Sequence, residues 1–490
     1  MPFHSDIEKW CDLKPNACAV TIGSESFSFQ NLIAERDELI CRIAGQEMRQ
    51  KKHPFDANVV AVIAENSSQF VSQFLAATFG QDCCLLLSSA LKPVQIRSVL
   101  DDIKPDLCFP HSSLEQIDHK LAVVGAARSN DIKFVNDDGA TTPFLIGLTS
   151  GTTSQPKAFI RNRLSWQKSF ARSRSVFDVN ETTTTISPGP LAHGLSLYAL
   201  AETLTAGAHF ISMEKFDAAQ LVELVKTHEA KRLVLVPTML SALCKLLETR
   251  NIKLNQITSI VSAGAKLDGA LLMRARKLIP NVKIFEYYGA SELGFITYAE
   301  RQSSSEHDVG KAFPGVEMTI RDGEGNDLPL GQSGTVWVKS DLVCDGYVSQ
   351  YDDAGFVHLD GWASVGDIGA LDKDGRLTLA GREGDMIISG GNNIYPSSVE
   401  AVLLNFDGVE NAAVLGLDDA HLGSKLVAIV SGTNIVEAEL LAHCRQSLPS
   451  YAIPKLIYEA QSWPMTESGK ISKKILMDWL ANNDDQLRQF

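Results

Sequence analysis

The stretch that decides how this chain is interpreted is Thr149-Ser150-Gly151-Thr152-Thr153-Ser154-Gln155-Pro156-Lys157. Backbone N–H groups freed by a glycine can fold around a phosphate, hydroxyls can donate to its oxygens, and a lysine adds a point charge. The run therefore predicts a polyphosphate site, and ATP as its ligand. It is not the common P-loop pattern, because Ala158, and not Ser or Thr, follows the lysine. By composition alone it also fits a Ser/Thr-rich surface loop.

Length, composition and charge describe a large globular protein. At 490 residues the chain is long enough for two or more domains, and its 44% hydrophobic and 21% charged content is ordinary. No apolar run approaches the roughly 18–20 residues that span a bilayer. The formal net charge of −14 argues against nucleic acid, because phosphate backbones are held by basic surfaces. We therefore expect neither a membrane span nor a nucleic-acid partner.

The nine cysteines contain no C-x-x-C pair, and Cys83 and Cys84 lie in an apolar run typical of a buried strand. The first residues lack the basic-then-apolar layout of a secretory signal. Thiols in a chain without such a signal stay reduced. We expect free thiols and a cytoplasmic protein.

The first two-thirds of the chain alternate strand-like and helix-like segments. Val59–Ala64 is a continuous apolar run, as expected for a strand buried on both faces. Helix-capping side chains at Asn66–Ser68 follow, then apolar residues at helical spacing and a second strand through residues 84–87. Further strands are expected at residues 233–236, 259–261 and 282–285. This alternation predicts an α/β domain with mainly parallel sheets.

The pattern changes after Glu300. Short alternating runs separated by turn signals such as Asp322-Gly323 predict a smaller β-rich subdomain. From about Gly381 a compact α+β unit follows, with helices expected from Ser397 and through residues 437–448, and strands near 412–415 and 426–430. Clustered glycines at its start are consistent with a hinge or with simple turns. We expect a domain over residues 1–380, a hinge at 381–385 and a mobile C-terminal domain at 386–490.

Further short segments carry side chains suited to nucleotide chemistry. Tyr287–Glu292 supplies an aromatic face, a hydroxyl and a carboxylate for a hard cation such as Mg²⁺. Gly264 and its neighbours follow an expected strand, where the backbone can approach a flat ligand. Asp367 could accept from two ribose hydroxyls, and Arg382 and Lys470 add cations. Taken singly, each residue also fits an ordinary structural or surface role, as a core tyrosine, a turn aspartate or an exposed lysine.

Taken in order, these segments resemble the superfamily of adenylate-forming enzymes, in particular its acyl-CoA synthetases. The resemblance runs from about Thr21 to Lys474. It is strongest in the stretch Gly381-Arg382-Glu383-Gly384-Asp385-Met386-Ile387-Ile388-Ser389-Gly390-Gly391-Asn392-Asn393-Ile394-Tyr395-Pro396. It implies that a carboxylate attacks the α-phosphate of Mg·ATP to give an acyl adenylate, and that a thiol, CoA, then displaces AMP. Attack of one anion on another needs positive charge and positioning.

The resemblance also implies a role for each matching residue. Lys470 would bridge the carboxylate and the α-phosphate as the catalytic cation. Ser291 would bind the α-phosphate, Glu292 would hold Mg²⁺ and Tyr288, followed by Gly289, would stack on adenine. The remaining contacts are divided between the phosphates (Thr149, Ser150, Gly151, Thr152, Thr153 and Lys157), the edges of adenine (Gly264, Ala265 and Glu286) and the ribose (Asp367 and Arg382). Glu286 stands where the family often has Asn or Asp.

Residues 190–198 resemble the segment that lines the acyl site, with His193 at its entrance. The alternative for His193 is a satisfied core histidine. Amino-acid-activating relatives carry an aspartate in this region, whereas here Ala192 and Leu195 offer no charge, which favours an apolar or weakly polar carboxylic acid. Two further departures from the family pattern are Ser154, where relatives usually have glycine, and Gly384, at the expected pivot of the C-terminal domain.

Two other functions stay open at this point. A stand-alone ligase of the same family would load its acyl group onto the phosphopantetheine of an acyl carrier protein instead of CoA. A non-catalytic paralogue would bind ATP without forming an adenylate. Nothing in the sequence indicates an oligomeric state.

Overall fold

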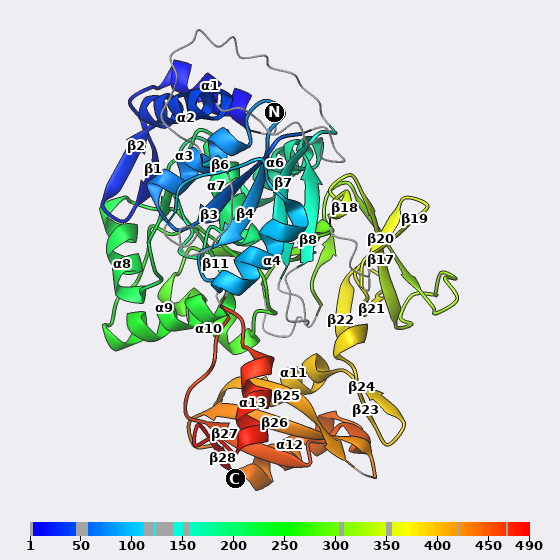
Figure 1. Ribbon diagram of the computed structural model, residues 1–490. Coiled ribbons are helices and arrows are strands. Elements are labelled where there is room, and N and C mark those ends of the chain that lie inside the picture. The colour runs from blue at the N-terminus through cyan, green and yellow to red at the C-terminus, as the bar shows by residue number, and fades with distance from the viewer. Residues whose placement is uncertain are drawn as a thin grey trace.

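The computed structural model describes residues 3–45, 57–111, 122–123, 141–149, 157–302, 308–348, 355–419, 421–466 and 469–490. Across them the chain forms a large lobe from its N-terminal part and a small lobe from its C-terminal part, with a β-rich unit beside the large lobe (Figure 1). The expected α/β fold with a β-rich unit and a small α+β domain is confirmed.

One sheet of the large lobe is built around β3 (Val59–Ala64). Its strand order is β18-β8-β7-β4-β3-β5-β6. The pairs among β4, β3, β5, β6 and β7 are parallel, and β7, β8 and β18 pair antiparallel. The other strands are β4 (Cys83–Ser88), β5 (Leu107–Cys108), β6 (Ala122–Val123), β7 (Pro143–Thr149), β8 (Lys157–Asn162) and β18 (Gly346–Tyr347). Every residue of β3 is buried, as expected for a strand covered on both faces.

A second sheet runs in the order β15-β14-β13-β12-β11-β9-β10-β1-β2. Its centre is parallel and both ends are antiparallel. Its strands are β1 (Cys18–Ile22), β2 (Glu25–Ser28), β9 (Thr185–Ile186), β10 (Phe210–Ser212), β11 (Arg232–Leu235), β12 (Ser259–Ser262), β13 (Lys283–Ala290), β14 (Gly294–Glu300) and β15 (Lys311–Ala312). The expected strand at residues 282–285 is longer than predicted, because β13 continues as a hairpin with β14.

Helices cover these sheets. They are α1 (His4–Leu13), α2 (Phe29–Ala44), α3 (Ser68–Ala77), α4 (Pro93–Ile103), α6 (Arg163–Phe177), α7 (Gly194–Thr205), α8 (Ala218–Thr227), α9 (Pro237–Thr249) and α10 (Gly269–Leu278). Ser67 caps α3 by accepting from Phe70 N at 3.1 Å, as the sequence predicted for this segment. Nine of the 12 residues of α7 are buried, which fits a helix that is apolar on most faces.

The β-rich unit is an antiparallel sheet of β16 (Val316–Arg321), β17 (Gly334–Ser340), β19 (Val357–Leu359), β20 (Trp362–Ser364), β21 (Asp367–Leu371) and β22 (Leu377–Arg382). A short 3-10 turn, Glu383–Asp385, connects β22 to the small lobe. The boundary at residue 380 stays a prediction, although β22 extends two residues beyond it.

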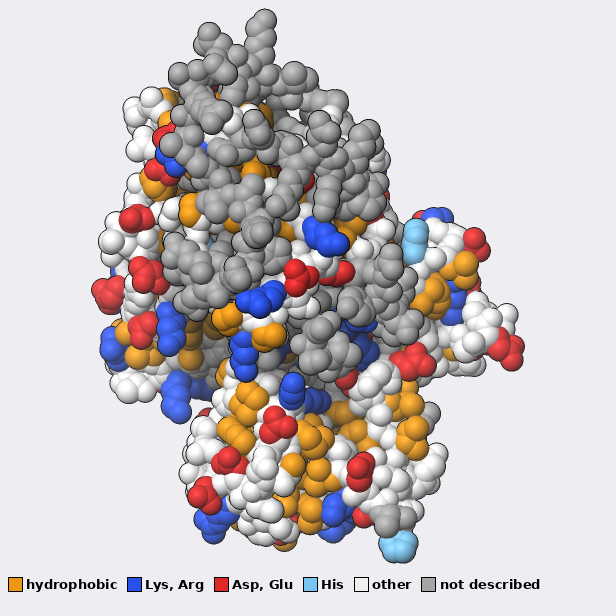
Figure 2. All heavy atoms as spheres, in the orientation of Figure 1, with side chains coloured by type: hydrophobic (Ala, Val, Ile, Leu, Met, Phe, Trp, Pro, Cys, Tyr) orange, Lys and Arg blue, Asp and Glu red, His pale blue; other side chains and the backbone are white. Residues whose placement is uncertain are grey.

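The small lobe has its own sheet and core. Its strands are β23 (Ile387–Ser389), β24 (Asn392–Ile394), β25 (Val409–Asp419), β26 (Gly423–Gly432), β27 (Leu456–Ala460) and β28 (Leu487–Gln489), and its helices are α11 (Pro396–Leu404), α12 (Glu437–Ser447) and α13 (Lys473–Asn482). Separate hydrophobic clusters from those of the large lobe fill its interior. On the face in Figure 2, Lys and Arg side chains lie on both sides of the junction between the lobes.

All nine cysteines lie in described parts of the chain and are free thiols, and Cys83 and Cys84 are buried on β4, as predicted. Within the described ranges, the helices are too short or too polar to cross a bilayer.

A buried ion pair anchors α7 to the second sheet. Glu202 on α7 and Arg232 on β11 lie 2.7 Å apart and are 0% and 2% exposed. Neither charge can be solvated if its partner is removed, so the pair is costly to break even though its formation contributes little.

We therefore expect Glu202→Ala to destabilise the large lobe by about 3–5 kcal/mol, because it leaves the Arg232 guanidinium buried and unpaired. The exposed pair Arg274–Glu248, 2.9 Å apart, provides the matched control, and Glu248→Ala should cost less than about 1 kcal/mol. Chemical denaturation followed by tryptophan fluorescence measures both. Equal effects of the two substitutions would contradict the assignment.

Candidate active site

A cavity of about 710 Å³ lies where the two lobes meet. Its walls come from both large-lobe sheets, the β-rich unit and the small lobe. Most of the predicted site residues line it: Thr149, His193, Gly264, Ala265, Glu286, Tyr288, Gly289, Ser291, Glu292, Asp367, Arg382 and Lys470. The structure therefore brings together residues that lie more than three hundred positions apart in the sequence.

The hydroxyl-rich run connects two paired strands at the edge of this cavity. Thr149 ends β7 and Lys157 begins β8, and the two residues are register partners. Thr149 Oγ1 donates to the Lys157 carbonyl oxygen at 3.4 Å. The intervening Ser150, Gly151, Thr152 and Thr153, and Ser154 with them, lie outside the described residues, so their phosphate-binding role stays a prediction.

Lys470 reaches the cavity on a hairpin of the small lobe. The hairpin is closed by Thr466 N donating to the Lys470 carbonyl oxygen at 2.7 Å and by Lys470 N donating to Thr466 Oγ1 at 3.1 Å. Thr238, at the start of α9, donates its hydroxyl to the Gly469 carbonyl oxygen at 2.9 Å. A Cβ on Gly469 would lie 2.9 Å from Val236 Cγ2, and its φ is +77°, so this close approach requires glycine.

The Lys470 side chain lies over Gly264. A Cβ on Gly264, where φ is +90°, would be 3.4 Å from Lys470 Cε. The cavity walls partly desolvate the ammonium and the Arg382 guanidinium repels it, and both effects lower the pKa of Lys470. Lys470 of the small lobe thus lines the same cavity as residues of the large lobe, and its catalytic role stays a prediction.

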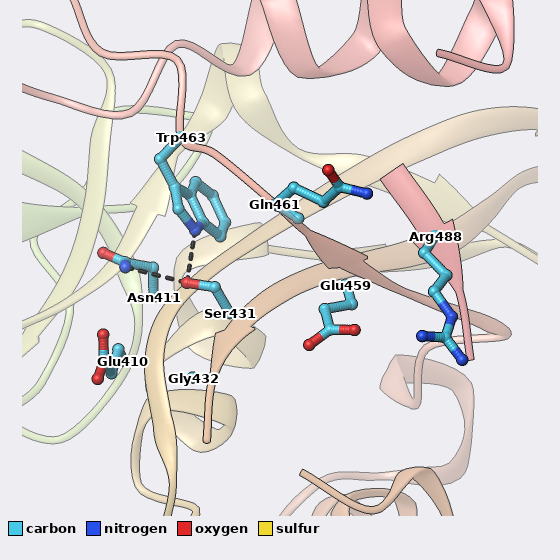
Figure 3. Close-up of a pocket in the computed structure, with 9 residues that line it drawn as sticks. Glu410, Asn411, Ser431, Gly432, Glu459, Gln461, Trp463 and Arg488 are labelled. Carbon is cyan, nitrogen blue, oxygen red and sulfur yellow. Dashed lines mark hydrogen bonds between the residues drawn. The ribbon is translucent and has the colours of Figure 1, made fainter. Parts of the chain in front are cut away.

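A second, polar hollow of about 560 Å³ lies on the small lobe itself, and Figure 3 shows its lining side chains. None of the predicted site residues lines it. Trp463 Nε1 and Asn411 Nδ2 both donate to Ser431 Oγ, at 2.6 and 3.1 Å. Because Trp463 directly precedes the hairpin of Lys470, its bond to Ser431 connects the base of that hairpin to β26.

Three predicted nucleotide-binding side chains bond to one another. The Tyr288 hydroxyl donates to Asp367 Oδ2, and Arg382 Nε donates to Asp367 Oδ1 at 2.8 Å. Burial and the nearby Asp367 carboxylate raise the pKa of Tyr288, which keeps its hydroxyl protonated as a donor. The network joins the second sheet to the β-rich unit at the start of the connection between the lobes.

Glu286 is the most constrained of the predicted contacts. It is 2% exposed, and its carboxylate accepts from Leu267 N at 2.6 Å, Lys266 Nζ at 3.0 Å and Arg301 Nε at 2.6 Å. A buried carboxylate with these partners is structurally essential to the loop after β12. Its predicted contact with adenine would be made by a group that is already extensively bonded.

Glu292 has the chemistry expected of a magnesium ligand. It is half-buried, and the Tyr347 hydroxyl donates to its Oε1 at 2.6 Å. Among the described residues there is no cluster of three or more His, Cys, Asp or Glu side chains able to hold a metal alone. A single carboxylate fits Mg²⁺ that arrives with phosphate oxygens, which is how this ion is usually bound.

Part of the cavity lining is aromatic. His193, which precedes α7, lines the same cavity as Trp166, Tyr198 and Phe295. The Tyr198 ring packs edge-on against Trp166 and Phe295, with centroids 5.4 and 5.0 Å apart. Its hydroxyl donates to Ser169 Oγ at 2.9 Å, so its polar end is satisfied.

Sequence reasoning missed three residues that hold this site together: Arg161, Thr238 and Tyr347. Arg161, which is 6% exposed, donates to the carbonyl oxygens of Leu342 at 2.6 Å and Ser291 at 2.7 Å. Lys157 and Arg161 stand at alternating positions on β8, so their side chains lie on the same face of the strand, and this spacing was a usable sequence signal. Thr238 and Tyr347 carried none, because their partners come from distant segments.

Comparison with known proteins agrees with this geometry. Residues 7–348 match the family model described as AMP-binding enzyme, and residues 398–470 match the AMP-binding enzyme C-terminal domain. An uncharacterized acyl-CoA ligase, YhfT, of Bacillus subtilis is 30% identical over 96% of this chain and 97% of its own length. A putative long chain fatty acid-CoA ligase, VraA, of Staphylococcus epidermidis is 34% identical over 69% of this chain and 72% of its own.

A solved structure shares the fold. ATP-bound MatB from Rhodopseudomonas palustris superimposes with a TM-score of 0.85 at 22% identity, covering 99% of each chain. The chain therefore belongs to the AMP-binding enzyme family, in the branch of the acyl-CoA synthetases. It is an enzyme of the AMP-forming acid–thiol ligase class.

The lowered pKa of Lys470 predicts the alkaline limb of adenylate formation. The cation is lost as pH rises through this pKa, so pyrophosphate release should fall at a lower pH than an ordinary lysine would give. Arg382→Gln removes the repelling guanidinium and should move the midpoint of the alkaline limb to higher pH, whatever it does to the maximal rate. A pH–rate series on both proteins tests this, and an unchanged midpoint would contradict it.

Proposed function

We propose that this enzyme activates a carboxylic acid with ATP to an acyl adenylate and then transfers the acyl group to CoA, releasing pyrophosphate and AMP. The observation that carries the proposal is the position of Lys470, which the small lobe places over Gly264 in the same cavity as Ser291, Asp367 and Arg382. ATP, Mg²⁺ and CoA are the expected ligands, and the cytoplasm is the expected location.

In the first half-reaction a carboxylate oxygen of the acid attacks the α-phosphorus. The bond from that phosphorus to the bridging oxygen breaks, and pyrophosphate leaves with the electron pair. The Lys470 ammonium would offset the negative charge of both reactants, and Ser291 would donate to the α-phosphate. Mg²⁺ held by Glu292 and phosphate oxygens would neutralise the charge of the leaving group.

Several other residues would bind and orient ATP. Thr149 and Lys157 flank the run proposed to hold the β- and γ-phosphates. The ring of Tyr288 would stack on adenine. Asp367 and Arg382 would exchange their present hydrogen bonds for bonds to the ribose. Such an exchange costs little net free energy, because each lost bond is replaced by another.

In the second half-reaction the thiol sulfur of CoA attacks the acyl carbon. The bond to the AMP oxygen breaks and the thiol proton is released. For the thiol to approach, we propose that the small lobe turns about residues 381–385 and withdraws Lys470. Gly384 suits this pivot, because glycine accepts a wide range of backbone angles. Among the described residues, no atom other than those of its chain neighbours lies within 4 Å of the position of a Cβ there.

The acid is proposed to be apolar or weakly polar. The cavity that His193 lines also presents Trp166, Tyr198 and Phe295, and the first turn of α7 offers no carboxylate to pair with an amino group. Burial of an apolar substrate group against these rings favours an aliphatic or aryl acid over an amino acid.

Pyrophosphate release across short-, medium- and long-chain, aryl and amino acids, with and without CoA, tests the function. Acid-dependent release that CoA stimulates, with acyl-CoA found by mass spectrometry, is the expected result. Release without stimulation by CoA would identify a carrier protein as the acceptor. The absence of pyrophosphate release with every acid, combined with retained ATP binding, would indicate the non-catalytic paralogue.

Lys470→Ala should separate the half-reactions. Adenylate formation is expected to fall at least a hundredfold, since the charge bridging two anions is removed, whereas thioester formation from a supplied acyl adenylate should stay near wild type. Lys474→Ala, an exposed lysine on α13, is the control and should leave both rates unchanged. Equal loss of both half-reactions in Lys470→Ala would refute the assigned role.

A further inference from the structure

Tyr347, which does not line the cavity, contacts two of the residues assigned to the triphosphate. Its hydroxyl donates to Glu292 Oε1 at 2.6 Å, and the Nζ of Lys157 lies 5.6 Å from its ring centroid. One side chain thus touches both the expected metal ligand and the lysine that ends the hydroxyl-rich run. A cation at this distance from an aromatic ring is attracted to its face.

The strand register holds Tyr347 beside Lys157. β18 pairs antiparallel with β8, so that Tyr347 is the partner of Phe159, two residues from Lys157. Val348 N donates to the Ala158 carbonyl oxygen at 2.8 Å, which continues the ladder toward Lys157. Phe356 packs edge-on against the tyrosine ring at 5.9 Å. The ring is therefore fixed by backbone pairing on one side and by an aromatic contact on the other.

Glu292 is fixed independently on its own side. Cys344 N donates to the Glu292 carbonyl oxygen at 2.7 Å, and the buried Arg161 guanidinium joins the carbonyl oxygens of Ser291 and Leu342. These bonds tie the turn of Ser291 and Glu292 to the segment that leads into β18. The hydroxyl of Tyr347 then determines where the carboxylate of Glu292 points.

We infer that Tyr347 is a positioning residue for the metal–triphosphate, acting through Glu292 and Lys157. This inference rests on the proposed function. Its hydrogen bond occupies Oε1 of Glu292, and within the described residues Oε2 takes no hydrogen bond, which leaves that oxygen available to a cation. The ring at the same time limits the directions that the Lys157 ammonium can take.

Tyr347→Phe removes the hydroxyl and keeps the ring. Binding of Mn²⁺ to the full-length protein with α,β-methylene-ATP, measured by electron paramagnetic resonance, should weaken about tenfold, as expected for a lost hydrogen bond to a charged group. The Mg²⁺ concentration for half-maximal pyrophosphate release should rise, while kcat at saturating Mg²⁺ stays near wild type. Tyr451→Phe, at a tyrosine 43% exposed on the small lobe, is the control and should change neither.

A double-mutant cycle distinguishes positioning from a general structural effect. In a Glu292→Gln background, Tyr347→Phe should weaken Mn²⁺ binding no further, because its target is already altered. Tyr347→Leu should additionally weaken nucleotide affinity, since it also removes the ring from Lys157. Additive effects in the cycle, or wild-type Mn²⁺ binding by Tyr347→Phe, would overturn the inference. Mn²⁺ binding and nucleotide affinity do not depend on turnover, whereas the Mg²⁺ dependence of pyrophosphate release does. Failure of the proposed function would therefore be seen separately, in the wild-type enzyme.

Discussion

The site depends on a contact between lobes, in which Gly469 packs against Val236 and places Lys470 over Gly264. Attack of a carboxylate on a polyphosphate requires an uncommitted positive charge. The other cations lining the cavity are engaged: Lys266 with Glu286, Arg382 with Asp367, and Arg161 with two carbonyl oxygens. Among described residues, Lys470 forms no ion pair. In a chain with a net charge of −14, the small lobe thus brings into the cavity the cation that is proposed to act on the two anions.

Behind this contact the site is held by polar bonds between segments far apart in sequence. Tyr288, Asp367 and Arg382 connect the second sheet to the β-rich unit, while Arg161 and Tyr347 connect the first sheet to the turn of Glu292. The bonds of Arg161 and Tyr347 hold the turn of Ser291 and Glu292 in place, so this turn needs little reorganisation when charge develops. Removing one partner in such a network leaves another polar group unsatisfied, which is more costly than the bond itself was worth.

Sequence reasoning found the fold because hydrophobic patterning is local. The apolar run Val59–Ala64 is a strand with the predicted bounds, and the change of pattern after Glu300 coincides with the β-rich unit. Family motifs identified residues that do line one cavity. Sequence reasoning could not identify Tyr347 or Thr238. Their importance comes from their partners Glu292 and Gly469, which only the folded chain brings near. The pairing of β13 with β14 was missed for the same reason.

Among the described residues, the lobes share neutral hydrogen bonds that can break and form again. Thr238 contributes one neutral hydrogen bond to Gly469, and Ser397 and Ser398 both donate to the Ala380 carbonyl oxygen across the connection. Each such bond is worth about 1 kcal/mol net, because water replaces it when it breaks. A large apolar interface would hold Lys470 more firmly but would also prevent its withdrawal, which the proposed second half-reaction requires. Weak docking and the proposed pivot at Gly384 are therefore two requirements of the same proposed chemistry.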